Sequence, residues 1–275
     1  MAINVLALRI CDNACARLPV QGMNAHMTAI MHHTLYDRRR IAFRYTAGTG
    51  PCIVFLPGYM SDMSGSKATA LFAEAQEHGR ACLLLDYSGC GQSAGETMGG
   101  DFAEGKLSRW RDEVLALVEN YVSGPVLLVG SSMGGWLMLL VAEHLRHRLA
   151  GMIGIAPAPD FTRWGYTDEQ RAKLAAGETI FEPNPYGPDP TPTYARFFAD
   201  AECHLRLENG IDLTCPVRLL HGKADADVPW DISLRLEAAL RSDDIQVTLI
   251  EDGDHRLSRA SDIAALKAIV AEFTG

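Results

Sequence analysis

The sequence predicts an α/β fold in which a mostly parallel sheet is covered by helices on both faces. From residue 32 onward, segments with strand character alternate with segments that have a helical apolar period. The strand segments include short, almost wholly apolar runs, which are typical of parallel strands buried on both faces. These runs lie at 52–56, 81–85, 125–129 and 216–220. This order of elements predicts one α/β domain.

The individual elements follow from their spacing and flanking residues. His32–Tyr36 and Ile41–Thr46 are expected to form an antiparallel pair at the start of the domain. A strand at 245–250 and a helix at 260–273 are expected to end it. Steps of three and four residues predict a further helix whose apolar stripe faces the sheet, carried by Leu107, Trp110, Val114, Leu117, Val118 and Tyr121.

The domain organisation follows from length and proline content. A chain of 275 residues, 48% of them hydrophobic, is long enough for a sizeable core, and we expect one domain over 31–275. Residues 1–30 are interpreted as a dispensable extension, either disordered or the product of a misassigned start. Prolines interrupt the strand–helix rhythm after residue 156, so 157–213 is predicted to be a cap inserted above the carboxyl ends of the strands.

Composition narrows the class of protein. The formal net charge of −9 argues against nucleic acid and anionic membrane surfaces as partners. Seven cysteines, an odd number scattered along the chain, do not suggest a disulfide framework and favour a reducing compartment. No apolar run is long enough to cross a bilayer. We therefore expect a cytoplasmic protein, or a mitochondrial one if the source is eukaryotic.

The pentapeptide Gly130–Gly134, with Ser132 at its centre, is the most informative motif. It follows an apolar strand segment directly and precedes an apolar helical segment. A strand that turns at once into a helix must tighten sharply, and small residues two positions before and after the serine permit that turn. A serine that only caps the following helix is the alternative. With partners present elsewhere, the motif predicts Ser132 as a nucleophile.

The partners of a nucleophilic serine occur downstream in the order acid, then histidine. Asp225 follows the strand 216–220 and the turn at Gly222, and His255 lies in a polar loop after the strand 245–250. Asp227 is the less favoured acid, because it lies two residues before Pro229 and could cap the helix beginning near Trp230. The sequence therefore predicts a Ser132–His255–Asp225 triad and an α/β-hydrolase fold.

An oxyanion hole requires two N–H groups near the nucleophile. The residue after the serine, Met133, supplies one, and the loop after the strand 52–56 is expected to supply the other. Tyr59, directly after Pro57 and Gly58, is the candidate. A plain strand-ending Pro–Gly turn is the alternative interpretation.

A second motif points to another class of enzyme. Gly89, Gly91 and Ala94 have the spacing of a dinucleotide-binding loop, which would indicate an oxidoreductase. However, Asp86 to Ser88 intervene after the strand, and loop residues follow where a helix should begin. We interpret Asp86 and these glycines as a tight loop beside the mouth of the active site. His144 and His147 share a helix face but lack further zinc ligands, so no metal or cofactor is expected.

From about residue 52 to the end, the chain resembles the α/β-hydrolase domain-containing protein ten family. The more specific matches are two short runs. One is Gly–Trp–Leu–Met at 135–138, directly after the pentapeptide around Ser132, and the other is Val–Pro–Trp at 228–230. The matching segments are 57–59 with Met63 and Gly65, 86–89 with Gly91 and Ser93, 130–132 with 134–139, 215–216 with 218–222, 228–230 and 254–256. By this resemblance, the family's serine, aspartate and histidine fall on Ser132, Asp225 and His255.

The resemblance implies a mitochondrial acyl-protein (palmitoyl-protein) thioesterase that also cleaves acyl glucuronides. The expected reaction is acyl transfer to water through an acyl-enzyme. A general carboxylesterase for small esters and a non-catalytic hydrolase-fold binding protein are the alternatives. Thioester or ester preference, acyl chain length, oligomeric state and the true start site are left open by the sequence.

Sequence neighbours of the catalytic residues suggest a substrate pocket. Met60, Met63, Met133 and Trp230 are expected to line an adaptable apolar acyl site, although core packing is the alternative for each. Arg163 and Arg196 of the predicted cap are candidates for attracting an anionic leaving group, against the commoner role of solvated surface arginines.

Overall fold

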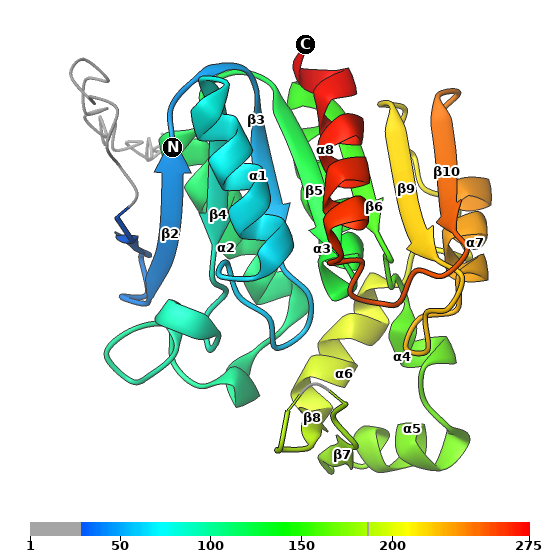
Figure 1. Ribbon diagram of the computed structural model, residues 1–275. Coiled ribbons are helices and arrows are strands. Elements are labelled where there is room, and N and C mark those ends of the chain that lie inside the picture. Colours follow the sequence, from blue (N-terminus) through cyan, green and yellow to red (C-terminus); the bar gives the residue numbers. More distant parts are fainter. Residues whose placement is uncertain (1–28, 186) are drawn as a thin grey trace, which may run out of the picture.

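An eight-stranded, mostly parallel sheet forms the centre of the computed structural model, which describes residues 29–185 and 187–275 (Figure 1). The strand order is β1-β2-β4-β3-β5-β6-β9-β10. The β1–β2 and β2–β4 pairs are antiparallel and the remaining pairs are parallel. The strands are β1 Met31–Thr34, β2 Arg40–Thr46, β3 Thr49–Leu56, β4 Arg80–Leu85, β5 Val126–Ser131, β6 Leu149–Ile155, β9 Val217–Gly222 and β10 Ile245–Ile250.

Helices cover both faces of the sheet, which confirms the predicted fold class. In Figure 1, α1 and α8 lie in front of the sheet, while α2 and α3 lie behind it. The helices are α1 Ser66–Glu77, α2 Leu107–Tyr121, α3 Met133–Leu145, α4 Phe161–Trp164, α5 Asp168–Ala175, α6 Ala195–Ala201, α7 Asp231–Ala239 and α8 Ala260–Thr274. Short 3-10 turns occur at Gly91–Ser93, Phe102–Glu104, Arg146–Arg148 and Glu202–His204.

Alternation along the central strands builds two separate cores. Val54 and Leu128 pack on the side of α2 and α3, whereas Ile53 and Leu127 pack on the side of α1 and α8. This arrangement explains why the central strands read as continuous apolar runs, because successive side chains enter opposite cores. The predicted stripe of α2 is buried from Leu107 to Val118, and Tyr121 is partly buried against the same core.

The first strand pair forms as predicted, with different bounds. β1 ends at Thr34, two residues earlier than expected, because Leu35 and Arg39 close a turn in which the Leu35 N–H donates to the Arg39 carbonyl. β1 and β2 then pair antiparallel. The predicted extension of residues 1–30 lies outside the described residues except for its last two positions.

The segment between β6 and β9 lies at the carboxyl ends of the parallel strands (Figure 1). It contains α4, α5 and α6 together with a small antiparallel pair, β7 Ile180–Glu182 and β8 Thr191–Thr193. Residues 157–213 were predicted to form a cap from their proline content. Their status as a separate cap stays a prediction, but their location places them over the edge where the candidate site residues meet.

The loop after β4 does not have the geometry of a dinucleotide-binding unit. Gly91–Ser93 form only a 3-10 turn, and the next α-helix, α2, begins at Leu107. No helix N-terminus therefore follows the glycines to hold a pyrophosphate. Instead, Ser93 fastens this loop to the sheet: its hydroxyl donates to the Asp86 carbonyl at 2.7 Å and accepts from the Ala42 N–H at 2.8 Å.

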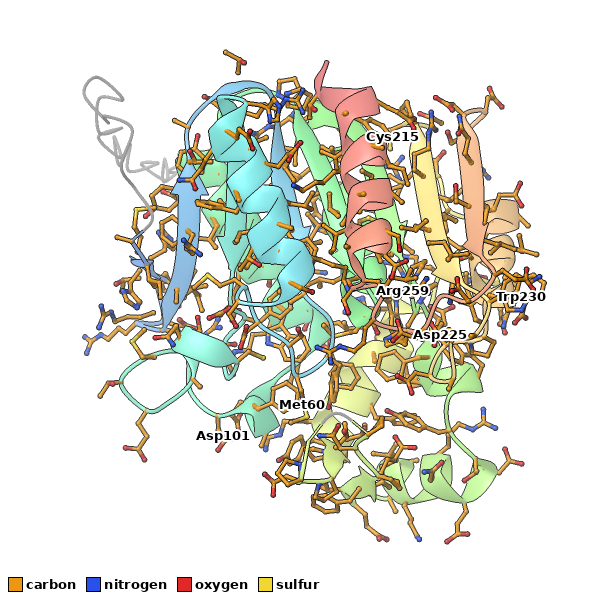
Figure 2. All side chains as sticks on the ribbon, in the orientation of Figure 1. Met60, Asp101, Cys215, Asp225, Trp230 and Arg259 are labelled. Carbon is orange, nitrogen blue, oxygen red and sulfur yellow. The ribbon has the colours of Figure 1, made fainter. Side chains whose placement is uncertain are left out.

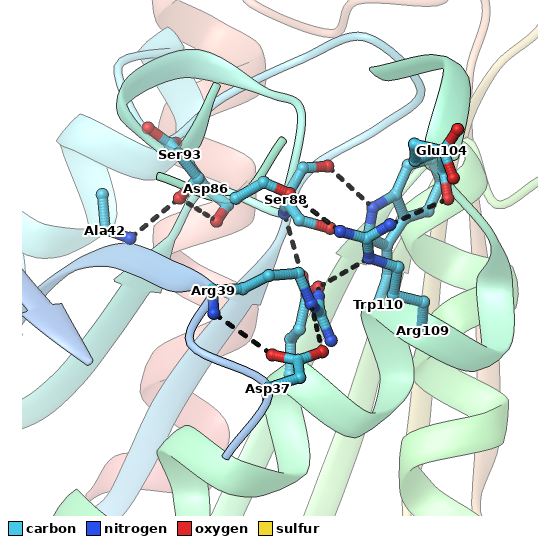
Figure 3. Close-up of polar contacts among 11 residues, drawn as sticks. Asp37, Arg39, Ala42, Asp86, Ser88, Ser93, Glu104, Arg109 and Trp110 are labelled. Carbon is cyan, nitrogen blue, oxygen red and sulfur yellow. Dashed lines mark hydrogen bonds and ion pairs between the residues drawn. The ribbon is translucent and has the colours of Figure 1, made fainter. Parts of the chain in front are cut away.

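A buried carboxylate, that of Glu113, connects the same loop to α2, and Figure 3 labels its partners Arg39, Ser88 and Arg109. Glu113 is fully buried and accepts a hydrogen bond from the Ser88 N–H at 2.9 Å. It also pairs with Arg39 and, at 3.6 Å, with Arg109. Burial raises the pKa of Glu113, although the Ser88 hydrogen bonds and the two arginines act in the opposite direction. The β1–β2 turn, the β4 loop and α2 thus share one buried acidic centre.

Replacing Glu113 by alanine is expected to destabilise the fold by about 3 kcal/mol, because two arginines and the Ser88 N–H lose a buried partner. Urea unfolding of the variant measures this loss as a lower midpoint with an unchanged slope. Asp112→Ala is the matched control, since Asp112 is 64% exposed and, in the part of the chain that the structure describes, forms an ion pair with its neighbour Arg111 alone. Its effect should stay within about 0.5 kcal/mol. Equal effects of the two substitutions would contradict the role given to Glu113.

Candidate active site

Loops from four strands meet at one edge of the sheet. The loops after β3, β5, β9 and β10 carry Tyr59, Ser132, Asp225 and His255, respectively. These strands are mutually parallel, so their carboxyl ends share that edge. Figure 2 labels Met60 and Asp225 at this end of the sheet, next to the segment between β6 and β9.

Ser132 occupies a strained position between β5 and α3. Its φ of 54° and ψ of −123° place it in a region that side-chain-bearing residues rarely adopt. The turn also brings α3 very close to β3: a Cβ on Gly134 would lie 2.1 Å from the carbonyl oxygen of Leu56. Only glycine fits there, which gives the physical reason for the small residue two positions after the serine.

The structure brings the three predicted side chains into one hydrogen-bonded row. Ser132 Oγ lies 3.1 Å from His255 Nε2, and His255 Nδ1 lies 2.8 Å from Asp225 Oδ2. Because the carboxylate accepts from Nδ1, the neutral ring carries its proton there and leaves Nε2 free to accept from the serine hydroxyl. The arrangement can therefore take a proton from Ser132. The catalytic roles themselves stay predictions.

Asp225 is held as a carboxylate by hydrogen bonds to both oxygens. Oδ1 accepts from the N–H groups of Asp227 and Val228 at 2.9 and 2.8 Å. Oδ2 faces two imidazoles, those of His255 and His221. Burial alone would raise the pKa of Asp225, but the hydrogen bonds from His221 and His255 outweigh it and hold the pKa well below its usual range. The carboxylate consequently stays charged beside the imidazole.

Asp225, rather than Asp227, faces the histidine. Asp227 lines the pocket beside the row, and α7 begins at Asp231 without a side-chain cap, so Asp227 does not cap that helix. The loops after β9 and β10 are tied together by a hydrogen bond of 3.0 Å from the Ala224 N–H to the Gly253 carbonyl. This tie keeps Asp225 and His255 on adjoining loops at a fixed separation.

Both segments predicted to form the oxyanion hole lie next to Ser132, and the oxyanion hole itself stays a prediction. Met133 is the first residue of α3, and the N–H groups of a first helical turn have no acceptor within their own helix. The loop of Tyr59 approaches from the other side, since a Cβ on Gly58 would lie 3.3 Å from Ser132 Cβ. The Tyr59 hydroxyl donates to the Pro192 carbonyl at 3.0 Å, which fastens this loop to the segment above it.

A pocket of about 760 Å³ opens onto the row. Met60 and Met133 line it, as predicted, together with Phe161, Trp164 and Tyr166 from the segment after β6. Met60 is 49% exposed and has a φ of 55°, so it lies at the mouth on a strained turn.

Two residues predicted for the pocket lie elsewhere. Met63 is buried in the core between the sheet, α1 and α8, because its N–H donates to the Asp86 carboxylate at 2.7 Å and its side chain turns inward. Trp230 directly precedes α7 and is not among the lining residues, and Figure 2 shows it at the outer margin of the molecule beyond Asp225. Core packing, the alternative interpretation, is correct for Met63.

The two cap arginines do not face the pocket either. Arg163 pairs with Glu202 at 2.9 Å, and Arg196 pairs with Glu104. Neither arginine lines the cavity. Both are about half exposed, with side chains 51% and 49% accessible, and thus follow the ordinary pattern of surface ion pairs.

The cations that do line the pocket, Lys67 and Arg256, were not found from the sequence. Lys67 is the second residue of α1, and its ammonium donates to the Arg256 carbonyl. Burial, together with the positive charge of Arg256, lowers the pKa of Lys67 to about 8, although Asp254 and Asp262 oppose the shift. Nothing in the sequence around Lys67 distinguishes it from a surface lysine, because its partner Arg256 is distant in sequence.

Within residues 29–185 and 187–275, two groups of side chains have the spacing of metal ligands. One is Glu74, Glu77 and His78 at the end of α1, and the other is Asp225, Asp227 and His255. In the second group, Asp225 and His255 already bind each other through their facing atoms. Among the described residues, no helix is long and apolar enough to span a membrane.

The fold and the hydrogen-bonded row define an α/β hydrolase, and comparison with known proteins agrees. A family model described as the alpha/beta hydrolase family matches residues 53–268. The chain belongs to this family and is a hydrolase.

Within the family, the resemblance to α/β-hydrolase domain-containing protein 10 is confirmed. The chain is 33% identical over 268 residues to the human protein named mitochondrial palmitoyl-protein thioesterase ABHD10, covering 96% of this chain and 85% of that one. It is 38% identical to the mouse protein of that name, covering 82% and 76%.

Two solved structures are similar to the chain over most of its length. The mouse α/β hydrolase domain-containing protein 10 is 34% identical, with a TM-score of 0.81, over 89% of this chain and 97% of that one. A putative hydrolase from Agrobacterium vitis S4 is 36% identical, with a TM-score of 0.82, over 90% and 100%. The curated relatives are named as mitochondrial, and the location of this chain stays a prediction.

The charge of Lys67 gives a pH-dependent prediction. Raising the pH through about 8 neutralises Lys67, so kcat/KM for an ester with an anionic leaving group should fall about three- to tenfold relative to a neutral ester of equal size. Lys67→Met should abolish this difference. Parallel pH profiles of the two esters measure the ratio directly, and a ratio that is constant across this range in the unaltered protein would contradict the assignment.

Proposed function

We propose that this protein is a serine hydrolase that cleaves acyl thioesters or esters through an acyl-enzyme. The observation that carries the proposal is the hydrogen-bonded row of Ser132, His255 and Asp225 at the floor of a large pocket. A neutral imidazole between a hydroxyl and a buried carboxylate is the arrangement that activates a serine.

In the first half-reaction, Ser132 Oγ attacks the acyl carbonyl carbon while its proton passes to His255 Nε2. Asp225 stabilises the imidazolium that forms, and the N–H groups of Met133 and Tyr59 bind the oxygen that becomes negative. The tetrahedral intermediate then breaks its bond to the leaving thiol or alcohol, which takes the proton from His255. Ser132 is left as an acyl ester.

Water completes the cycle in the second half-reaction. His255 Nε2 removes a proton from the water molecule as its oxygen attacks the acyl carbonyl. Collapse of the second intermediate breaks the bond to Ser132 Oγ, which regains a proton from His255. The products are a free acid and the original enzyme, so no cofactor is consumed.

The preferred substrate in this proposal is a palmitoyl-type acyl thioester on a protein. The names of the relatives support this choice, as do the apolar walls supplied by Met60, Met133 and Phe161. The segment 157–213 acts as a cap that shapes access. A general carboxylesterase for small esters is the second candidate, because Lys67, Glu182 and Asp227 add polar walls to the same pocket. A mitochondrial location is proposed if the source is eukaryotic.

Ser132→Ala should abolish hydrolysis of model thioesters and esters, with a fall in kcat on the order of 10⁵-fold or more. A fluorophosphonate probe should label the unaltered protein and not the variant. Ser242→Ala is the control, because Ser242 lies just before β10, at the amino ends of the parallel strands, whereas the row lies at their carboxyl ends. Hydrolysis retained by Ser132→Ala would reject Ser132 as the nucleophile. Loss of labelling in both variants would point to damage unrelated to catalysis.

A series of acyl thioesters and matching oxygen esters of increasing chain length tests the substrate class. We expect kcat/KM to rise with acyl chain length, by up to about fourfold for each buried methylene, until the chain fills the apolar part of the pocket. Higher values for the thioesters favour a thioesterase, and higher values for short oxygen esters favour a general carboxylesterase. The same rate at every length would reject an acyl pocket.

A further inference from the structure

A buried histidine that the proposed reaction does not use lies next to the carboxylate of Asp225. His221 is the fifth residue of β9 and is fully buried. Its ring stands between Asp225, at the carboxyl end of the same strand, and Ser233 on α7. Strand residues at such positions are normally apolar, so a buried imidazole there requires a reason.

The contacts of His221 determine where its proton lies. Nε2 is 3.1 Å from the Val228 carbonyl and 3.2 Å from Asp225 Oδ2, and both of these atoms are acceptors. The proton of the neutral ring must therefore be on Nε2. Nδ1, 2.7 Å from Ser233 Oγ, then accepts from that hydroxyl. Every polar atom of His221 and Ser233 in this chain of contacts has a partner.

The same atoms continue the row beyond the acid. Asp225 Oδ2 lies 3.2 Å from Nε2 of His221 on one side and accepts Nδ1–H of His255 on the other. The order of side chains is thus Ser233, His221, Asp225, His255, Ser132. It runs from α7, past the carboxyl ends of β9 and β10, to the turn between β5 and α3. The titratable groups that face Asp225 are these two imidazoles and Asp227, whose carboxylate lies within 4.8 Å of Asp225 and His255.

We propose that His221, oriented by Ser233, is a positioning residue that aims the Asp225 carboxylate at His255 and disperses part of its charge. The proposal rests on the proposed function of the row. A carboxylate with one fewer donor can rotate about its side-chain bonds, and its charge then acts more strongly on the neighbouring imidazolium. Loss of His221 would therefore disturb both the alignment of His255 and the charge of the carboxylate that faces it.

The test compares His221→Leu, His221→Gln and Ser233→Ala by steady-state kinetics on a model thioester. Fluorophosphonate titration counts the active sites, so rates refer to folded enzyme. His221→Leu should lower kcat on the order of ten- to a hundredfold and leave KM within about twofold. Glutamine keeps an N–H near the position of Nε2 and should recover most of the rate. Ser233→Ala should give an intermediate loss of about three- to tenfold.

The pH profile separates positioning from a merely structural role. In His221→Leu the acidic limb of kcat/KM should move to higher pH by roughly half a unit, because the less-shared carboxylate stabilises the His255 imidazolium. A structural role alone lowers the number of active sites without moving the limb. His144→Leu is the control, since His144 lies in the last turn of α3, away from Ser132, and should behave as the unaltered protein.

An unchanged kcat per titrated site, an unmoved acidic limb, or a glutamine variant as poor as leucine would each overturn the proposal. If His221→Leu does not fold, Ser233→Ala and His221→Gln test the proposal instead. The same two measurements apply, kcat per titrated site and the position of the acidic limb. Failure of the proposed function looks different, because Ser132→Ala would then keep its activity whatever the His221 variants do.

Discussion

The geometry of the active site depends on the carboxylate of Asp225. It accepts hydrogen bonds from the loop after β9 and from the loop after β10, and Nε2 of His221 on β9 lies 3.2 Å away. Two backbone N–H groups fix one oxygen, and two imidazoles share the other. A charge buried in this way is tolerated only when it is fully paired. The same contacts therefore keep the acid ionised and hold His255 in position against Ser132.

Backbone strain and close packing bring the remaining groups to this carboxylate. The turn between β5 and α3 puts Ser132 in an unfavourable conformation, and the approach of α3 to β3 leaves no room for a side chain at Gly134. Met60, on the facing loop, has a positive φ as well. Residues in such conformations persist only where the surrounding structure holds them. Here the surrounding structure is the buried sheet, whose parallel strands end at a common edge.

The sequence was sufficient for the fold class and for the three side chains of the row, because Ser132, Asp225 and His255 each follow a predicted strand, and parallel strands end together. It was less informative about the pocket. Being next to a catalytic residue along the chain does not determine which way a side chain points. Met63 turns into the core and Trp230 lies at the outer margin. Lys67 reaches the pocket from the start of α1, and its ammonium contacts the Arg256 carbonyl in a loop that is distant in sequence.

The central claim is that Ser132 carries the acyl group between the two half-reactions. Mixing the enzyme with a long-chain acyl thioester and quenching in acid within the first turnover, followed by mass spectrometry, tests it directly. The account predicts a burst of free thiol together with one acyl group on the peptide that contains Ser132. Rapid hydrolysis with no acylated protein, or with the acyl group on another residue such as the exposed Cys203, would contradict it.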